Sequence, residues 1–332
     1  MKTKNTLLWL FILFITGFAS GFAIKAVLSG RGTEISCDTS AFSHINRNIV
    51  CGRVLVVQKH GYKVLKSKIE KYVRSKMTEK KLSNASVYFH DLQAGPTMGI
   101  NEHEPFIPAS LLKVPLMMTY LNLAEGKPEF LQKMLGYRVE GVENKAPPYY
   151  LPSEKIQENE PYTIEELLRR MIVFSDNNAY LALFNYLQKL SPNADLLGET
   201  LNEIGISSPK SSEDAVITVK NYASLFQMLF NSSFFQSPDV SEKALSWLAA
   251  SNFRNGLTKK LPPDIEVAHK FGERFGYNGD EKQLHDCGIV YYPGNPYLLC
   301  VMTRGNNFDE LSEAIGDISR MTYEEFDSRR IK

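Results

Sequence analysis

The pattern of apolar and polar positions divides the chain into strand-like segments near both ends and helical segments between them. Alternation bordered by turn residues indicates strands at 85–92, 97–101, 266–272, 284–292 and 297–303. Apolar residues recur at helical spacing in 64–80, 110–125, 163–174, 177–190, 218–230, 241–250 and 308–329. This order predicts an α+β domain, in which a five-stranded antiparallel sheet is flanked by helices and an all-helical subdomain is inserted.

The first apolar run is long enough to cross a membrane. Residues 6–24 are almost uninterruptedly apolar and follow two lysines, which places the N-terminus in the cytoplasm and the rest of the chain on the outer face. Residues 1–28 are therefore a membrane anchor or a cleaved signal peptide. The anchor is favoured because apolar residues continue beyond the small residues Gly17 and Ala19, where cleavage would occur.

Two further stretches lack sustained periodicity. Residues 29–63 are largely polar and are expected to form a stalk, so that the folded domain would comprise residues 64–332. The proline-rich stretch 146–161 is long enough for a lid or rim. The net charge of +1 gives no general attraction to nucleic acid.

The four cysteines suit an exported protein. Cys37 and Cys51 lie close enough along the chain to pair. Cys287 and Cys300 lie on consecutive strands and could face one another, but two buried free thiols are the favoured interpretation. No C-x-x-C or Cys/His spacing suggests zinc, and neither a metal nor a cofactor is expected.

Three short motifs follow in order. In the first, Ser110 and Lys113 are three residues apart at the start of a predicted helix, so that hydroxyl and amine share one face. A lysine whose pKa is lowered by burial is able to activate a serine nucleophile. The second is Ser175-Asp176-Asn177 between two predicted helices, where capping the second helix is the competing role.

The third motif is Lys270-Phe271-Gly272 on a late strand. A strand lysine beside a cleft is able to anchor a carboxylate, and the glycine would let a substrate backbone approach. The competing interpretation is an ordinary edge lysine.

Together these motifs resemble the S-x-x-K, S-D-N and K-T-G motifs of class A β-lactamases and penicillin-binding D-alanyl-D-alanine peptidases. The resemblance covers roughly residues 64–330. It implies that Ser110 is the acylated nucleophile, that Lys113 is its base, and that Ser175 passes a proton to the leaving amine. It also implies that Asn177 orients the substrate or Lys113.

The resemblance further implies the binding of the substrate. Lys270 and Gly272 would contact it, with Lys270 binding its carboxylate. The backbone N–H groups of Ser110 and Glu273 would form an oxyanion hole. One departure is Phe271, which replaces the hydroxyl residue of K-T-G and removes a donor to that carboxylate.

The second departure concerns deacylation. Class A β-lactamases carry an E-x-x-x-N pair that positions the deacylating water, and residues 205–218 hold no such pair. Glu199 and Asn202 are one residue too close together. Glu213 is the best remaining carboxylate, ahead of Asp214, although two solvated loop acids are the favoured interpretation. Slow turnover of an acyl-enzyme is therefore expected.

The sequence thus favours an extracytoplasmic serine hydrolase that is acylated by a β-lactam or by a D-Ala-D-Ala-type amide of a peptidoglycan stem peptide. Its other expected partner is the membrane, through the N-terminal helix. The alternative is a penicillin-binding, wall-binding or sensor protein that uses the same fold without turnover. A structural membrane protein that matches the motifs by chance is the third hypothesis.

Overall fold

The computed structural model describes residues 40–47, 61–93, 95–137, 149–206, 216–275 and 281–330. Ser40–Lys332 form one compact unit, to which the following description refers. Residues 6–24, Cys37, Cys51 and Glu213 lie outside the described residues. Within the described ranges, no helix is both long and apolar enough to cross a bilayer.

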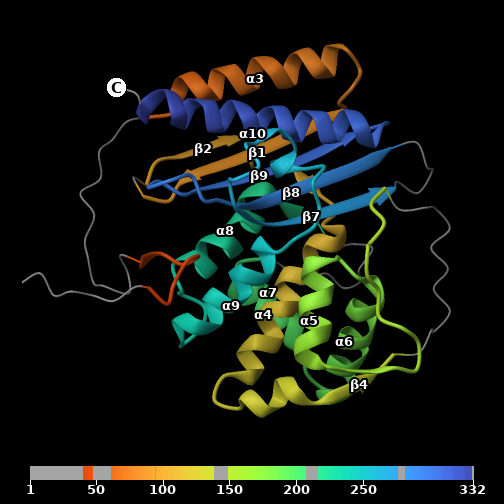
Figure 1. The fold of residues 1–332 in the computed structure, drawn as a ribbon. Helices are drawn as coiled ribbons and strands as arrows, with labels where there is room; N and C mark the ends of the chain where they lie inside the picture. The colour runs from red at the N-terminus through yellow and green to blue at the C-terminus, as the bar shows by residue number, and fades with distance from the viewer. Residues whose placement is uncertain are drawn as a thin grey trace, which may run out of the picture. The chain divides into compact units, whose positions relative to one another are not determined.

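A five-stranded antiparallel sheet lies at the centre, in the order β2-β1-β9-β8-β7 (Figure 1). The strands are β1 (Asn84–Asp91), β2 (Thr97–Ile100), β7 (Val267–Phe275), β8 (Lys282–Val290) and β9 (Tyr297–Gly305). The predicted α+β class and five-stranded sheet are therefore confirmed. β7 is an edge strand, and it continues beyond the predicted end of its segment.

Two helices from opposite ends of the sequence cover one face of the sheet (Figure 1). They are α3 (Lys63–Thr78) and α10 (Phe308–Arg330). The buried residues Leu65, Ile69 and Val73 recur every four positions on α3, as expected for a helix with one apolar face. They belong to the same buried cluster as the apolar residues of α10 and of the sheet face beneath.

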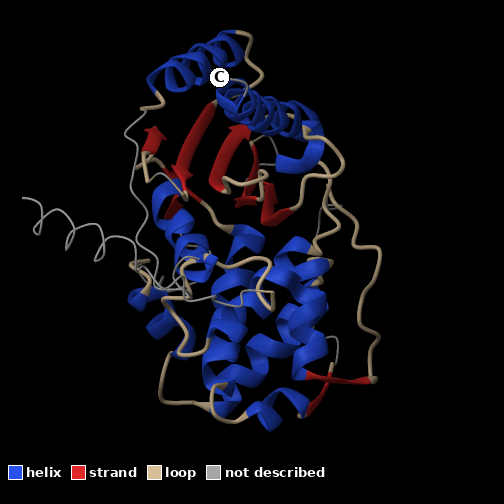
Figure 2. Ribbon diagram, turned by 60° about the vertical axis from the view of Figure 1, so that its left-hand side comes forward, coloured by secondary structure: helices blue, strands red, loops and turns tan. Residues whose placement is uncertain are grey.

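The inserted helical region lies on the other side of the sheet, so that the strands run between two layers of helices (Figure 2). α8 and α9 contact the sheet, and α4 lies deep among the helices. The helices of this region are η1 (Ala109–Leu112), α4 (Lys113–Ala124), η2 (Pro128–Gln132), α5 (Ile164–Val173), α6 (Asn177–Leu190), α7 (Leu196–Glu203), α8 (Val219–Phe230) and α9 (Pro238–Ala249). The short helix η3 (Leu257–Lys260) packs against α10 instead.

Short strands complete the connections between these helices. They form two-stranded ladders, β3 (Pro105–Phe106) with β6 (Ile217–Thr218) and β4 (Met134–Gly136) with β5 (Pro161–Thr163). The sequence pattern did not predict them, because two or three residues are too few to display an alternation.

Part of the expected stalk packs onto the domain. The backbone N–H groups of Ser43, His44 and Ile45 donate to the Glu242 carboxylate on α9, at 2.8–3.1 Å. Ile45 is buried in the same cluster as the helical core. The packed domain therefore includes residues that precede 64.

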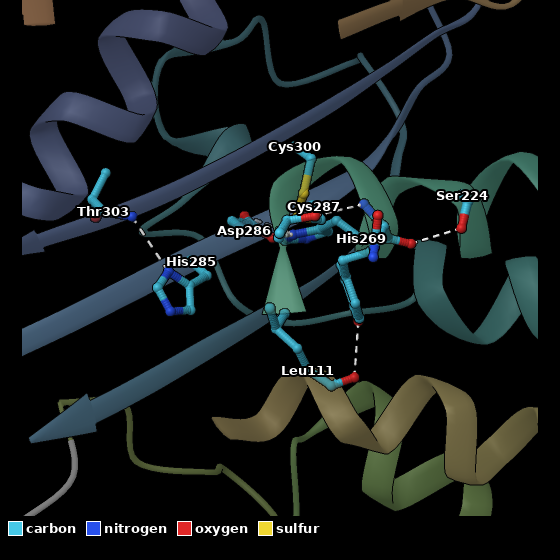
Figure 3. Close-up of a disulfide and its surroundings, with 11 residues drawn as sticks. Leu111, Ser224, His269, His285, Asp286, Cys287, Cys300 and Thr303 are labelled. Atoms are coloured by element: carbon cyan, nitrogen blue, oxygen red, sulfur yellow. Dashed lines mark hydrogen bonds and ion pairs between the residues drawn. A yellow bond between two sulfur atoms is a disulfide. The ribbon is translucent and has the colours of Figure 1, made fainter. Parts of the chain in front are cut away.

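The favoured interpretation of Cys287 and Cys300 as free thiols is wrong, because the structure joins them by a disulfide (Figure 3). They are direct cross-strand partners in the β8–β9 ladder. The register of the hairpin thus decides the pairing, which spacing along the sequence alone left open.

Candidate active site

Ser110 lies in η1, which leads directly into α4, and not in the first turn of an α-helix. Ala109 before it has a φ of 49°, an uncommon left-handed conformation for a residue with a Cβ. Behind the turn, the buried Tyr222 hydroxyl of α8 donates to the Leu111 carbonyl at 2.9 Å. A strained turn held by a buried hydroxyl therefore presents Ser110 at the rim of a cleft.

The sheet holds the same turn from the other side. His285 of β8 donates from Nε2 to the Ile107 carbonyl at 3.1 Å. Its Nδ1 accepts the Thr303 backbone N–H, so the ring proton lies on Nε2 (Figure 3). Burial lowers the pKa of His285 to about 3, and the ring therefore stays neutral at ordinary pH.

Gly272 of β7 allows this close packing. A Cβ there would lie 2.7 Å from the Pro108 carbonyl oxygen, a distance that real Cβ atoms do not show. The glycine is therefore required by the approach of the chain's own backbone. This differs from the expectation that it makes room for a substrate.

Lys113, the first residue of α4, is 2% exposed. Its amine donates to the Ser175 carbonyl and to Asn177 Oδ1, both at 2.7 Å, and lies 3.1 Å from Ser175 Oγ. Burial lowers the pKa of Lys113 to about 7, although the Asp176 and Glu273 carboxylates oppose the shift. A neutral amine has two N–H bonds, which these two carbonyl oxygens accept, and its lone pair remains for a hydroxyl. Lys113 is thus suited to act as a base.

Ser175 occupies the corner between α5 and α6 with a φ of 55°. Its Oγ lies within hydrogen-bond distance of two amines, 3.1 Å from Lys113 and 2.9 Å from Lys270. When both donate to this oxygen, its own proton is left to donate elsewhere. The cap of α6 is Asp176, whose Oδ1 accepts the Asn178 backbone N–H at 2.8 Å. The motif therefore has both of the roles considered for it: Asp176 caps α6, and Ser175 lies at the cleft.

Lys270 is fully buried. Its amine donates to Ser175 Oγ and to the Phe271 carbonyl, both at 2.9 Å, and lies 4.2 Å from the centroid of the Phe271 ring. Burial and the nearby Lys113 hold the pKa of Lys270 well below its usual value. The expected direct contact with a substrate carboxylate is not what this geometry offers, because the amine lies behind Ser175 and Phe271.

A buried histidine–aspartate pair supports this strand from behind. His269 Nδ1 lies 2.9 Å from both carboxylate oxygens of Asp286 on β8, and both residues are fully buried (Figure 3). Asp286 also accepts the Leu257 backbone N–H at 2.8 Å. Its negative charge favours the protonated form of Lys270 and partly offsets the burial of that amine.

The carboxylate of Glu273 also lines the cleft, a feature that the sequence analysis missed because it considered only the backbone N–H of this residue. It accepts the Tyr150 backbone N–H at 3.0 Å. Burial raises the pKa of Glu273 to about 7, opposed by the N–H groups of Tyr149 and Tyr150 and by the two lysines. The sequence feature that could have revealed this carboxylate is the glutamate directly after the third motif.

The cleft has a volume of about 700 Å³. It brings together Ser110, Lys113, Ser175, Asn177 and Glu273, while Lys270 and Gly272 lie directly behind its surface. Its lining residues are Ile107, Ala109, Ser110, Leu112, Lys113, Tyr150, Pro152, Lys155, Ser175, Asp176, Asn177, Asn178, Tyr180, Phe271, Glu273, Arg274 and Phe275. Three of these come from the stretch 146–161, which was expected to form a lid or rim.

The Glu199 and Asn202 pair does not lie at the cleft. Glu199 and Asn202 are exposed on α7, and neither is among the described residues that line the cleft. Among the residues that the structure describes, no three His, Cys, Asp or Glu side chains converge as metal ligands.

Comparison with known proteins identifies the family. A model of the Beta-lactamase enzyme family matches residues 65–326. No curated protein matches the chain. A variant of PBP-A, solved as the acyl-enzyme complex with penicillin G, is 21% identical over 82% of this chain and 100% of its own, with a TM-score of 0.65.

Two β-lactamases are similar to the same degree. TLA-3 extended-spectrum beta-lactamase is 17% identical over 80% of this chain and 99% of its own, with a TM-score of 0.66. A class A beta-lactamase from Bacteroides cellulosilyticus is 20% identical over 80% and 99%, with a TM-score of 0.64. At these identities the solved structures demonstrate a shared fold. Because the family match spans most of the sequence, the chain belongs to the Beta-lactamase enzyme family.

Proposed function

We propose that this protein is a serine hydrolase that forms an acyl-enzyme on Ser110 with an amide or lactam acyl donor and releases the acyl group slowly. β-Lactams and D-Ala-D-Ala-type amides are the first donors to test. Ser110 attacks the carbonyl carbon, its proton passes to Lys113, and the C–N bond breaks as Ser175 donates a proton to the leaving nitrogen. Lys113 then returns the proton to Ser175 Oγ.

One observation carries this proposal: the amine of Lys113, three residues after Ser110, lies within 3.1 Å of Ser175 Oγ and beside Asn177 inside a single cleft. A buried amine without a carboxylate in direct contact is costly to a fold, whereas a base with a pKa near the working pH is what serine activation requires. The lowered pKa of Lys113, about 7, meets that requirement.

Slow deacylation is the second part of the proposal. Hydrolysis of an acyl-enzyme needs a base that activates water. Glu199 and Asn202 are exposed on α7 and are not among the described residues that line the cleft, and Glu273 accepts a hydrogen bond from the backbone of the cleft rim. Among the described residues, Lys113, which is neutral again after acylation, is then the base for both steps, and a site without a second base to hold the water is expected to hydrolyse the ester slowly.

The location of the protein is also a proposal. We infer that it acts on the outer face of a membrane, with the N-terminal apolar run as its anchor. The Cys287–Cys300 disulfide supports this inference, because such bonds persist mainly in oxidising compartments. Protease accessibility of the C-terminal domain on intact cells, compared with cells whose membrane has been opened, tests it.

Intact-mass spectrometry tests the acyl-enzyme. The protein is incubated with benzylpenicillin and, separately, with an activated thioester of an N-acyl-D-alanine. Each adduct should map to Ser110 and be lost in Ser110→Ala. Adducts that persist in Ser110→Ala, or the absence of an adduct with every donor, would refute the assignment.

Turnover separates an enzyme from a protein that only binds. Decay of the purified adduct should proceed over minutes to hours and return unmodified protein plus the hydrolysed acyl group. An adduct that never decays would support the non-turnover wall-binding or sensor function on the same fold. Fast turnover that is lost in Glu213→Gln would show instead that Glu213 activates the water.

A further inference from the structure

The corner of the cleft formed by residues 270–273 of β7 differs in charge from a site built to bind a carboxylate. In a site that recognises a substrate carboxylate, an exposed cation and a hydroxyl donor are expected to converge on the anion. Here the strand residues at that corner are Lys270, Phe271, Gly272 and Glu273. None of these four side chains is an exposed cation or a hydroxyl.

The amine of Lys270 is already engaged. It is fully buried and donates to Ser175 Oγ and to the Phe271 carbonyl. The face of the Phe271 ring covers it at 4.2 Å from the centroid. Lys270 is not among the described residues that line the cleft, whereas Phe271 is.

Packing holds Phe271 in place. Its ring stacks on Phe253 with centroids 3.8 Å apart, and Tyr150 packs edge-on against it at 4.9 Å. Tyr150 is itself tied by its hydroxyl to Asn252. A ring that is 3% exposed and held between two other aromatic rings does not swing aside at low cost.

Glu273 adds a negative group at the same corner. Its carboxylate lies on the strand face that it shares with Phe271 and is fixed by the Tyr150 N–H. The pKa of Glu273 is raised to about 7, so that a substantial fraction is ionised at neutral pH. An anionic substrate group placed here would meet an aromatic ring and a second anion.

We propose that this site selects acyl donors whose leaving group carries no carboxylate at the β7 corner, such as an internal peptide bond, a carboxamide or another neutral amide. The inference rests on the proposed acyl transfer at Ser110 and specifies its substrate class. It sets this cleft apart from one built for a terminal D-Ala carboxylate, which Lys270 was expected to bind.

Two cations of the cleft are the competing anchors for an anion. Lys155 is exposed on the rim stretch, and Arg274 lies on the strand face of Lys270 and Gly272, opposite to that of Glu273. If an anionic donor bound through Arg274, neutralising that side chain would slow acylation by the anionic donor alone. The experiment therefore includes Arg274→Gln.

The test compares two matched thioesters of one N-acyl-D-alanine on the full chain. The leaving group of one is thioglycolate, and that of the other is the corresponding carboxamide. Ser110 forms the ester bond, the C–S bond breaks, and the thiol leaves with the proton that the serine gave up. Thiol release and intact mass give the acylation rates, each divided by the hydroxide-catalysed rate of the same thioester.

The carboxamide should acylate Ser110 at least about tenfold faster, the factor expected when a desolvated carboxylate finds no donor. Glu273→Gln should reduce this ratio at least about threefold, because it removes the repelling charge and keeps the size of the side chain. The matched control Glu129→Gln removes a carboxylate from η2, outside the cleft, and should leave the ratio unchanged. Phe271→Thr should reduce the ratio further if the variant folds.

The outcomes are distinct. A ratio below about ten, a ratio unaffected by Glu273→Gln, or a selective loss of the anionic reaction in Arg274→Gln would overturn the inference while acyl transfer at Ser110 stands. Failure of both thioesters to modify Ser110 would overturn the proposed function and this inference with it. A ratio above ten that falls in Glu273→Gln supports the inference.

Discussion

The pH dependence of acylation offers a direct test of Lys113 as the base. With an ordinary lysine pKa of 10.5, only about one molecule in 3,000 would carry the neutral amine at pH 7. Burial lowers the pKa of Lys113 to about 7, so that about half of the molecules carry it. The structure therefore accounts for a gain of roughly a thousandfold in active base. The acylation rate should rise tenfold per pH unit below pH 7 and level off above it.

Stopped-flow thiol release from the neutral thioester, between pH 5 and 9, measures the rising limb of this pH–rate profile. Lys113→Met should lower the rate by about 10²- to 10⁴-fold and remove the limb, as expected when a general base is lost. Ser110→Ala supplies the background rate. The neutral thioester is used because its own charge does not change over this range.

Glu273 is the group that could imitate this result, because its pKa is also raised to about 7. The two groups are distinguished by Glu273→Gln. The Glu273 carboxylate stabilises the ammonium form of Lys113, so removing it should shift the midpoint to lower pH and keep the limb. A limb that vanishes in Glu273→Gln would refute the assignment of the base to Lys113. A rate that still rises tenfold per unit up to pH 9 in the native protein would refute its lowered pKa.

Two further predictions concern the framework of the site. Gly272→Ala should destabilise the domain by about 1–3 kcal/mol and slow acylation, because its Cβ would lie 2.7 Å from the Pro108 carbonyl oxygen. The control is Gly136→Ala, whose Cβ meets nothing within 4 Å. Equal denaturant midpoints for the two variants would contradict the reasoning. Replacing both Cys287 and Cys300 by alanine should lower the free energy of unfolding by about 3 kcal/mol, the value for a loop of this length. An unchanged midpoint of chemical unfolding in the double variant would argue against the disulfide.

Local sequence information was sufficient for the framework of the fold and for the members of the site. Most strands and helices were expected from their apolar pattern, and the first two motifs fall at the boundaries of helices, whereas the third lies within β7. Lys113 and Ser175 could be expected to meet because the order of the three motifs matches a known arrangement. The positive φ angles at Ala109 and Ser175 carry no such sequence signal, since neither residue is a glycine.

The remaining features depend on contacts between distant segments. Phe271 covers the Lys270 amine because Phe253 and Tyr150 pack around it, and no local pattern specifies that packing. The disulfide was missed for a related reason. The connection between Val290 and Tyr297 fixes the register in which Cys287 faces Cys300, and only the paired strands reveal it.

The energetic cost of the site argues that it exists for chemistry. Lowering the pKa of Lys113 from 10.5 to about 7 corresponds to roughly 5 kcal/mol of destabilisation at pH values below 7, where the folded state must bury an ammonium group. This cost diminishes as the pH rises from 7 to 10.5, because the unfolded chain then also loses the proton. Lys270 adds a second buried amine on the same hydroxyl oxygen, so the two cations repel each other. Apolar side chains of similar size would fill this space more stably. Two amines that converge on Ser175 are therefore what the proposed proton transfer at Ser110 and Ser175 requires, and packing gives no reason for them.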